Sequence, residues 1–129
     1  MQIPPGFTQL FPYLFVEGAE AYLKFLVDGL GGQVTSLHRN PDDSIANAHV
    51  VFGDTTIMVS EARDEFVPTQ ATYYLYVENA DAATGQAEAA GATVMFAPTD
   101  MDYGDRQSGV RDSAGNVWWL SQRLAPGPY

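Results

Sequence analysis

The sequence predicts an α+β protein built from two tandem βαβββ modules. The first observation is an internal repeat, in which YLFVEGAEA, beginning at Tyr13, matches YLYVENADA, beginning at Tyr74, at six of nine positions. The second is that a helix-like segment and three strand-like runs follow each copy. The third is the offset of 61 residues between the copies, which is close to half of the 129-residue chain. One structural unit therefore occurs twice.

The first module is predicted to continue with a helix. Apolar residues recur from Ala19 to Leu30 with the spacing of one helix face, and a Gly-Gly pair then ends the helix. Turn sequences separate the strand-like runs that follow. These runs are Val34–His38, Ile45–Phe52 and Thr56–Ser60.

The second module is predicted to follow the same order. Asn79 is the expected N-cap of its helix and Gly91 the expected stop. Small residues form the face of this helix that we expect to pack on a sheet, namely Ala80, Ala83 and Ala87. The predicted strands are Thr93–Ala97, Gln107–Arg111 and Val117–Gln122.

These elements place the first module at about residues 8–61, a polar connector at 62–70 and the second module at about 71–124. We expect the whole chain, 1–129, to form a single domain. A lone module leaves one face of its sheet uncovered, so two modules are expected to share a cleft. The modules could pair within one chain or be exchanged between two chains.

Alternation along the first strand of each module separates two kinds of side chain. One face is aliphatic, with Leu14 and Val16 in the first copy and Leu75 and Val77 in the second. The other face is aromatic or hydroxyl-bearing. Its members are Phe11, Tyr13 and Phe15, matched by Thr72, Tyr74 and Tyr76. Aromatic surfaces with a few polar groups are typical of small-molecule sites, although these rings could also simply fill the interior of the sheet.

Composition excludes several classes of function. The net charge is −10, from 16 acidic and 6 basic residues, so nucleic acid is not an expected partner. There is no cysteine, which rules out disulfides and thiolate metal sites. No apolar stretch is long enough to span a membrane, and no signal peptide is recognised. We expect a cytoplasmic protein without a membrane partner.

Three long stretches resemble the vicinal oxygen chelate superfamily, which comprises glyoxalases, bleomycin resistance proteins and extradiol dioxygenases, and in particular its glyoxalase-like, PhnB-like branch. They are FPYLFVEGAEAYLKFL, PDDSIANAHVVFGDTTIMVSEA and DYGDRQSGVRDSAGNVWWLSQRL. The resemblance runs from about Thr8 to Leu124. It implies a U-shaped mixed eight-stranded sheet with a central cleft, helices on the outer face, and a homodimer.

Enzymes of this superfamily usually hold a divalent metal on the first and last strands of both modules. The resemblance carries those positions over to Phe11, Met58, Thr72 and Trp119. Phe and Trp offer no donor atom for such metals, and Met and Thr offer poor ones. We therefore expect no metal and no other cofactor. The alternative is a non-standard metal site around His49 and Glu61.

The residues expected to line the ligand-binding cleft are Phe11, Tyr13, His49, Met58, Thr72, Tyr74, Tyr103, Arg106 and Trp119. Arg106 could instead be structural, paired with Asp105 or Asp102. The function indicated first is metal-free binding of an aromatic or cationic small molecule, as in drug-sequestering members of the superfamily. The alternatives are a divergent glyoxalase-like lyase, isomerase or dioxygenase, and an accessory dimer whose cleft is filled by its own side chains. No catalytic residue is assigned.

Overall fold

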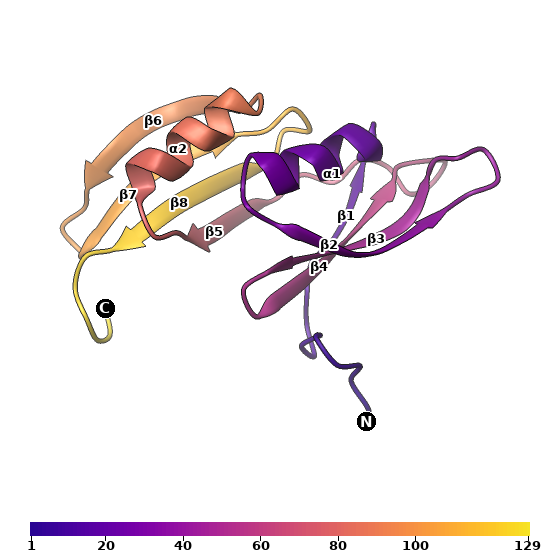
Figure 1. Cartoon of the computed structure of the whole chain (residues 1–129), viewed down its shortest axis with the longest axis horizontal. Helices are drawn as coiled ribbons and strands as arrows, with labels where there is room; N and C mark the ends of the chain where they lie inside the picture. Colours follow the sequence, from indigo (N-terminus) through magenta and orange to yellow (C-terminus); the bar gives the residue numbers. More distant parts are fainter. The chain divides into compact units, whose positions relative to one another are not determined.

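The computed structural model describes residues 1–129 and divides them into two compact units, Met1–Thr69 and Gln70–Tyr129, called here the first and second modules (Figure 1). Each contains four strands and one helix in the predicted order. The first module holds β1 (Tyr13–Val16), α1 (Ala19–Asp28), β2 (Gln33–Arg39), β3 (Ile45–Phe52) and β4 (Thr55–Glu61). The second holds β5 (Thr72–Tyr76), α2 (Ala80–Ala89), β6 (Thr93–Asp100), β7 (Asp105–Arg111) and β8 (Val117–Arg123).

The eight strands form two four-stranded mixed sheets, one in each module. The first sheet has the order β1-β4-β3-β2 and the second the order β5-β8-β7-β6. In both, the first and last strands of the module pair in parallel, and the remaining neighbours are antiparallel. The predicted α+β class and the repeated βαβββ order are confirmed. The shared cleft and the description of residues 1–129 as one domain stay predictions.

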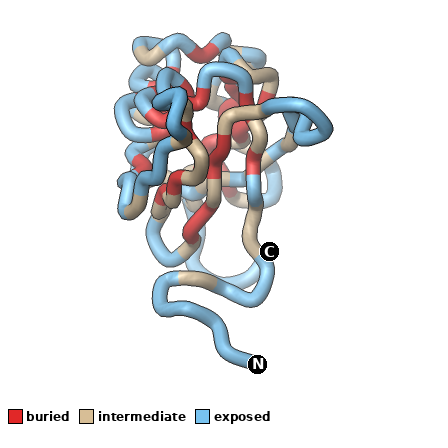
Figure 2. The backbone as a smooth tube through the Cα atoms, turned by 90° about the vertical axis from the view of Figure 1, so that its right-hand side faces the viewer, coloured by how far each residue is buried: buried red, intermediate tan, exposed pale blue.

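One face of each sheet packs beneath the helix of its own module. In the first module, Leu14, Val16 and Val59 are almost fully buried under α1. In the second, Trp118 and Leu120 occupy the corresponding face. Burial of these apolar side chains is the main stabilising contribution to each module. Most buried positions lie along the strands and helices, whereas none of the residues before β1 is buried (Figure 2).

The face of α2 that packs on its sheet differs from the predicted one at a single position. Ala80 and Ala87 are buried as expected, but Thr84 is buried in place of Ala83. The Thr84 hydroxyl donates to the carbonyl of Ala80 at 2.6 Å, and it lies 2.6 Å from the hydroxyl of Ser108 on β7. A buried hydroxyl must be hydrogen-bonded, and this position provides two partners.

The two helices begin in different ways. Asn79 caps α2 as predicted, because its Oδ1 accepts a hydrogen bond from the N–H of Ala82 at 2.9 Å. Helix α1 follows Gly18, whose backbone is left-handed with φ 74°, and this residue supplies no side-chain cap. The first turn of α1 therefore needs acceptors from elsewhere in the module. Both helices contain ten residues, well short of the length that crosses a bilayer.

Candidate functional site

Three aromatic rings stack on the face of the first sheet that points away from α1. The ring of Tyr13 lies 4.6 Å from that of Phe15, with 16° between their planes. The ring of Phe66 lies 5.4 Å from Phe15 at 21°. Phe66 belongs to the predicted connector, which runs beside β1 because the N–H of Thr69 donates to the carbonyl of Phe15 at 2.9 Å. The connector thereby extends the aromatic surface of the sheet.

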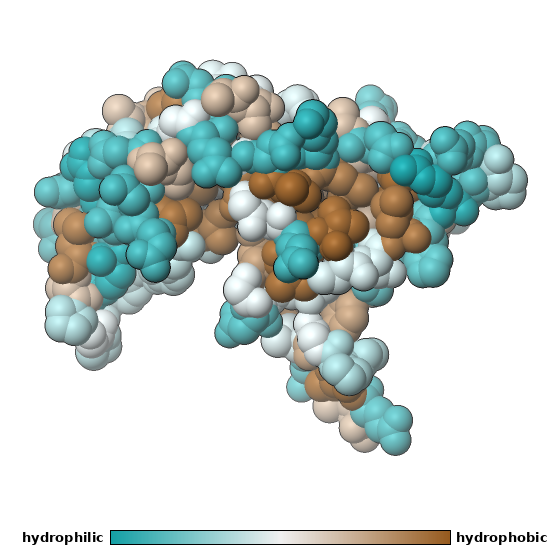
Figure 3. Space-filling model, in the orientation of Figure 1, coloured by the Kyte–Doolittle hydropathy of each residue, from teal (hydrophilic) through white to brown (hydrophobic).

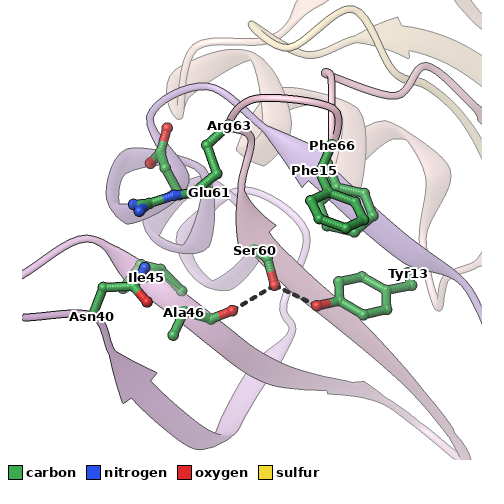
Figure 4. Close-up of a pocket in the computed structure, with 9 residues that line it drawn as sticks. All are labelled: Tyr13, Phe15, Asn40, Ile45, Ala46, Ser60, Glu61, Arg63 and Phe66. Atoms are coloured by element: carbon green, nitrogen blue, oxygen red, sulfur yellow. Dashed lines mark hydrogen bonds between the residues drawn. The ribbon is translucent and has the colours of Figure 1, made fainter.

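This ring stack borders a pocket of about 320 Å³ within the first module (Figure 4). Pockets that bind small molecules start at roughly this volume. Polar and charged side chains lie opposite the rings. The lining residues are Tyr13, Phe15, Asn40, Ile45, Ala46, Ser60, Glu61, Arg63 and Phe66. Apolar residues also gather on the visible surface of this module, edged by hydrophilic ones (Figure 3).

Hydrogen bonds fix the polar side of the pocket. The hydroxyl of Ser60 donates to the carbonyl of Ala46 at 2.8 Å and lies 2.7 Å from the hydroxyl of Tyr13 (Figure 4). Since the Ser60 proton is used by Ala46, Tyr13 is the donor in the second bond. Asn47 Nδ2 donates to the Tyr13 hydroxyl at 3.3 Å. The phenol at the pocket edge is therefore held in one orientation.

Four predicted site residues come together on the face of the first sheet that points away from α1. The face of each sheet that points away from its helix is called here the open face. Met58 on β4 lies directly between Tyr13 on β1 and His49 on β3. Phe11 precedes β1, and the ring of Phe7 joins it to His49, at 4.9 Å from Phe11 and 5.1 Å from His49. The imidazole of His49 thus packs against an aromatic ring on this face of the sheet.

Glu61 has a structural role at the other end of β4. Its two carboxylate oxygens accept hydrogen bonds from the N–H groups of Gly18 and Ala19, each at 3.0 Å. These bonds supply the acceptors that the first turn of α1 lacks, and the negative charge suits the helix dipole. Glu61 is three residues beyond Met58, so its side chain leaves the opposite face of the sheet from His49. The alternative metal site around His49 and Glu61 is not favoured by this geometry.

The positions that bind metal in related enzymes do not fit a divalent ion here. In the first module they hold the Phe11 ring and the Met58 thioether, and in the second the Thr72 hydroxyl and the Trp119 indole. This donor set lacks any carboxylate or imidazole. The structure also contains no group of three or more His, Cys, Asp or Glu side chains arranged to hold a metal ion. The lack of a cofactor stays a prediction.

In the second module, Tyr74 and Trp119 are direct neighbours on the open face of the sheet, and Thr72 lies at the start of β5. Trp119 faces Gly109 on β7, and its ring lies 5.0 Å from that of Phe96, at 63°. A Cβ atom on Gly109 would lie 2.4 Å from both rings. Glycine is therefore required here, and the two rings occupy the space above it.

A fully buried carboxylate lies on the same face. Asp105 is 0% exposed, and its Oδ2 accepts hydrogen bonds from the hydroxyls of Tyr74 at 2.6 Å and Tyr129 at 2.8 Å. Its Oδ1 accepts from Nη1 of Arg123 at 3.0 Å. Gln107 Nε2 in turn donates to the Tyr74 hydroxyl at 2.8 Å. Every polar atom of this carboxylate is therefore satisfied within the module.

The pKa values in this cluster follow from its contacts. Burial alone would raise the pKa of Asp105, but the hydrogen bonds from Tyr74, Tyr129 and Arg123 outweigh it, and the pKa lies below its usual value. The hydrogen bond with Tyr76, burial and the contact with Asp105 all raise the pKa of Tyr129. Asp105 is thus ionised at neutral pH, and Tyr129 carries the proton that it donates.

The remaining two predicted site residues lie on opposite faces of the second sheet. Tyr103 donates a hydrogen bond to Oε1 of Gln107 and so joins the open face. Arg106 points to the helix side, where it forms ion pairs with Asp81 on α2 at 2.8 Å and with Asp100 at 2.9 Å. The structural pairing of Arg106 with Asp105 or Asp102 was a wrong prediction. Asp105 pairs with Arg123 instead.

Several residues of these two faces were absent from the predicted site. In the first module they are Phe15, Asn40, Ser60, Arg63 and Phe66, and in the second Tyr76, Asp105, Gln107, Arg123 and Tyr129. The period-two pattern contained the signal for Phe15 and Tyr76, which share the aromatic face. Nothing in the local sequence indicates that Phe66 and Tyr129 fold back onto a sheet.

Comparison with known families gives a match that covers most of the chain. A family model described as the glyoxalase/bleomycin resistance protein/dioxygenase superfamily matches residues 7–120. An uncharacterised protein of Mycobacterium bovis, Mb0911c, is 29% identical over 124 residues, which cover 88% of this chain and 82% of that protein. The PhnB-like branch stays a prediction.

Solved structures with the same fold include proteins from a Micromonospora and a Streptomyces species. TioX from Micromonospora sp. ML1 has a TM-score of 0.77 at 21% identity, over 91% of this chain and 99% of TioX. TnmS3 from Streptomyces sp. CB03234, described as an antibiotic binding protein, has a TM-score of 0.72 at 22% identity, over 95% of this chain and 98% of TnmS3. At these identities the likeness establishes the fold.

Proposed function

The chain belongs to the glyoxalase/bleomycin resistance protein/dioxygenase superfamily, and we propose that it binds a planar aromatic small molecule without a metal ion. The pocket of the first module is the site we assign to this ligand. The stacked rings of Tyr13, Phe15 and Phe66 along that pocket are the observation that carries the proposal.

The exposure of these rings supports a binding role. Tyr13 is 45% exposed and Phe66 is 52% exposed. Exposed aromatic surface beside a concave pocket is typical of ligand sites. A planar ligand that stacks on the outermost ring would gain roughly 0.5–1.5 kcal/mol beyond the burial of its area.

Charge favours a cationic ligand. The net charge of −10 attracts cations from a distance. The one basic side chain of the pocket lining, Arg63, is already engaged, because its Nη2 donates to Ser44 and to Asp42 at 3.4 Å. Arg63 therefore opposes a cation less than a free guanidinium would.

The residues at the family's metal positions support binding without metal. Phe11 and Met58 lie on the open face of the first module and give it ring and thioether surface. Such groups favour contact with an apolar ligand over coordination of a hard or borderline cation. TnmS3, described as an antibiotic binding protein, has the same fold, so sequestration of a drug-like molecule is the role we propose.

Titration with proflavine, a planar three-ring cation, tests the proposal. We expect a dissociation constant in the micromolar range, unchanged by EDTA, and chemical-shift changes at the backbone amides around Tyr13 and Phe66. Replacement of Phe66 by Ala removes one ring of the stack, so binding should weaken about tenfold, equivalent to about 1.4 kcal/mol. Anthracene-9-carboxylate, a planar three-ring anion, should bind more weakly than proflavine.

Val67→Ala is the matched control, since Val67 is the 61% exposed neighbour of Phe66 and does not line the pocket. This variant should bind proflavine like the unaltered chain. Equal affinity in Phe66→Ala would contradict the proposed site. Loss of binding on chelation, restored by a divalent metal, would overturn the metal-free mechanism.

A further inference from the structure

Tyr129 sits on the second module as a bound phenol would. Its hydroxyl donates to Oδ2 of the buried Asp105 at 2.8 Å and also contacts the hydroxyl of Tyr76. Because the single Tyr129 proton goes to Asp105, Tyr76 is the donor in the second contact. The guanidinium carbon of Arg123 lies 4.3 Å from the centre of the Tyr129 ring, and the ring of Tyr103 lies 6.3 Å away at 67°. The module therefore contacts both the hydroxyl and the ring of Tyr129.

The groups that recognise this phenol are held in place without it. Asp105 also accepts hydrogen bonds from Tyr74 at 2.6 Å and Arg123 at 3.0 Å. Arg123 Nη1 donates in addition to the carbonyl of Tyr103 at 2.8 Å. A Cβ on Gly104 would lie 2.9 Å from this Nη1, so glycine leaves the room that Arg123 occupies. If Tyr129 left, one acceptor position of the ionised Asp105 carboxylate would be open to another donor, such as water or the hydroxyl of a ligand.

The segment that carries Tyr129 is weakly attached. Residues 125–129, called here the tail, are all exposed, and Tyr129 itself is 70% exposed. Nη2 of Arg123 donates to the carbonyls of Gly127 and Pro128 at 3.4 and 3.3 Å, which is near the upper limit for a hydrogen bond. Segments with few buried contacts open at low free-energy cost. A ligand that reproduces the Tyr129 contacts can therefore compete with the tail.

Room for the remainder of a larger ligand adjoins this position. A pocket of about 470 Å³ in the second module is lined by Tyr76, Val77, Glu78, Gln122 and Arg123. Tyr76 and Arg123 also contact Tyr129, so the pocket begins where the phenol ring lies. A molecule with a phenolic end could place its hydroxyl on Asp105 and extend into this space.

We propose that the second module contains a phenol-binding subsite, formed by Asp105, Tyr76 and Arg123, which Tyr129 of the same chain occupies until a phenolic ligand displaces it. This inference goes beyond the proposed function, because it concerns different residues in the other module and adds a hydrogen-bonded specificity. An aromatic molecule without a hydroxyl group would cover the Asp105 carboxylate and donate no hydrogen bond to it. The subsite therefore rejects such a molecule.

The test compares 4-methylphenol with 4-methylanisole, whose methoxy group cannot donate a hydrogen bond. NMR titrations of the full chain should show 4-methylphenol shifting the amides of Tyr76, Asp105 and Arg123. In Tyr129→Ala, which empties the subsite, 4-methylphenol should bind about tenfold more tightly than in the unaltered chain, since the competing tail side chain is gone. The anisole should show no such gain.

Tyr129→Ala/Tyr76→Phe provides a second variant that keeps the fold, since Tyr76 is 57% exposed. It removes the hydroxyl that donates to the phenol oxygen, so the affinity gained in Tyr129→Ala should fall several-fold. Equal binding of phenol and anisole to Tyr129→Ala, no gain over the unaltered chain, or no binding at all would each overturn the proposal. Shifts confined to Tyr13 and Phe66 would also overturn it, and would leave the first-module proposal standing. Failure of the proflavine test affects only the first module.

Discussion

Glu61 and Gln122 hold equivalent places at the ends of β4 and β8, and each accepts hydrogen bonds from the N-terminus of its module's helix. Glu61 receives the N–H groups of Gly18 and Ala19 at 3.0 Å, and Gln122 receives the N–H of Ala80 at 2.9 Å. Both modules therefore join the last strand to the start of the helix by side-chain hydrogen bonds. The Glu61 carboxylate of the first module therefore has a structural role at the start of α1.

Glu61→Ala should destabilise the first module by about 1–2 kcal/mol, because two N–H groups at the start of α1 lose their acceptors. Urea unfolding measures the change. Glu61→Gln is the control, since it restores the side chain that serves the same purpose at position 122. It should recover at least half of the loss. A stability unchanged in Glu61→Ala would show that water replaces the carboxylate without cost.

Gly109→Ala should displace the aromatic pair above β7. The added Cβ would lie 2.4 Å from ring atoms of Phe96 and Trp119, so at least one ring must move. Overpacking of this kind costs about 1–3 kcal/mol, and the Trp119 fluorescence should change with it. Thermal unfolding and emission spectra provide the two readouts.

Gly85→Ala is the matched control for this substitution. Gly85 lies within α2, and a Cβ there meets nothing within 4 Å. Alanine should stabilise the helix by up to about 1 kcal/mol. Destabilisation of similar size by both substitutions would mean that the packing over Gly109 is not the cause.

Asp112 holds the turn between β7 and β8. Its Oδ1 accepts the N–H groups of Ala114 and Asn116, both at 3.0 Å, and its Oδ2 accepts Nε1 of Trp118 at 2.9 Å. Asp112→Ala leaves buried donors unpaired, so we expect a loss of about 3 kcal/mol or more in urea unfolding. Asp112→Asn keeps one acceptor oxygen and should lose less. Equal loss in both variants would point to the charge as the decisive factor.

Much of the fold was predictable because several strands, such as β1, β5 and β6, alternate between two faces, and each helix has a marked end. Strand β3 was predicted with the bounds Ile45–Phe52 that the structure has. The Arg106 error arose because the predicted strand began at Gln107, whereas β7 begins at Asp105. Neighbouring residues of a strand face opposite sides, so Asp105 and Arg106 cannot pair once both belong to β7.

The site was less predictable, since its missing members arrive from segments without periodicity. Phe66 reaches Phe15 through hydrogen bonds between the connector and β1, and Tyr129 reaches Asp105 across the sheet face. Both contacts join residues distant in sequence. Only tertiary structure determines which ring of an irregular segment will pack on which strand.

The raised pKa of Tyr73 should make the second module less stable at alkaline pH. Its ring stacks on Trp118 at 4.5 Å, and burial, together with the negative charge of Asp112, raises its pKa from 10.0 to about 12. The unfolded chain loses the phenol proton near pH 10, whereas the folded chain keeps it to about pH 12. The contribution of Tyr73 to the free energy of unfolding is therefore fully present below pH 10 and is lost as the pH rises from 10 to about 12. Tyr73→Phe keeps the stack on Trp118 but has no phenol proton to lose. The free energy of unfolding, measured with urea at pH 8 and pH 11, should therefore decrease less in this variant than in the unaltered chain. The difference should be roughly 1 kcal/mol, given the partial solvation of the Tyr73 hydroxyl. An identical decrease in both proteins would exclude Tyr73 as a source of the alkaline instability.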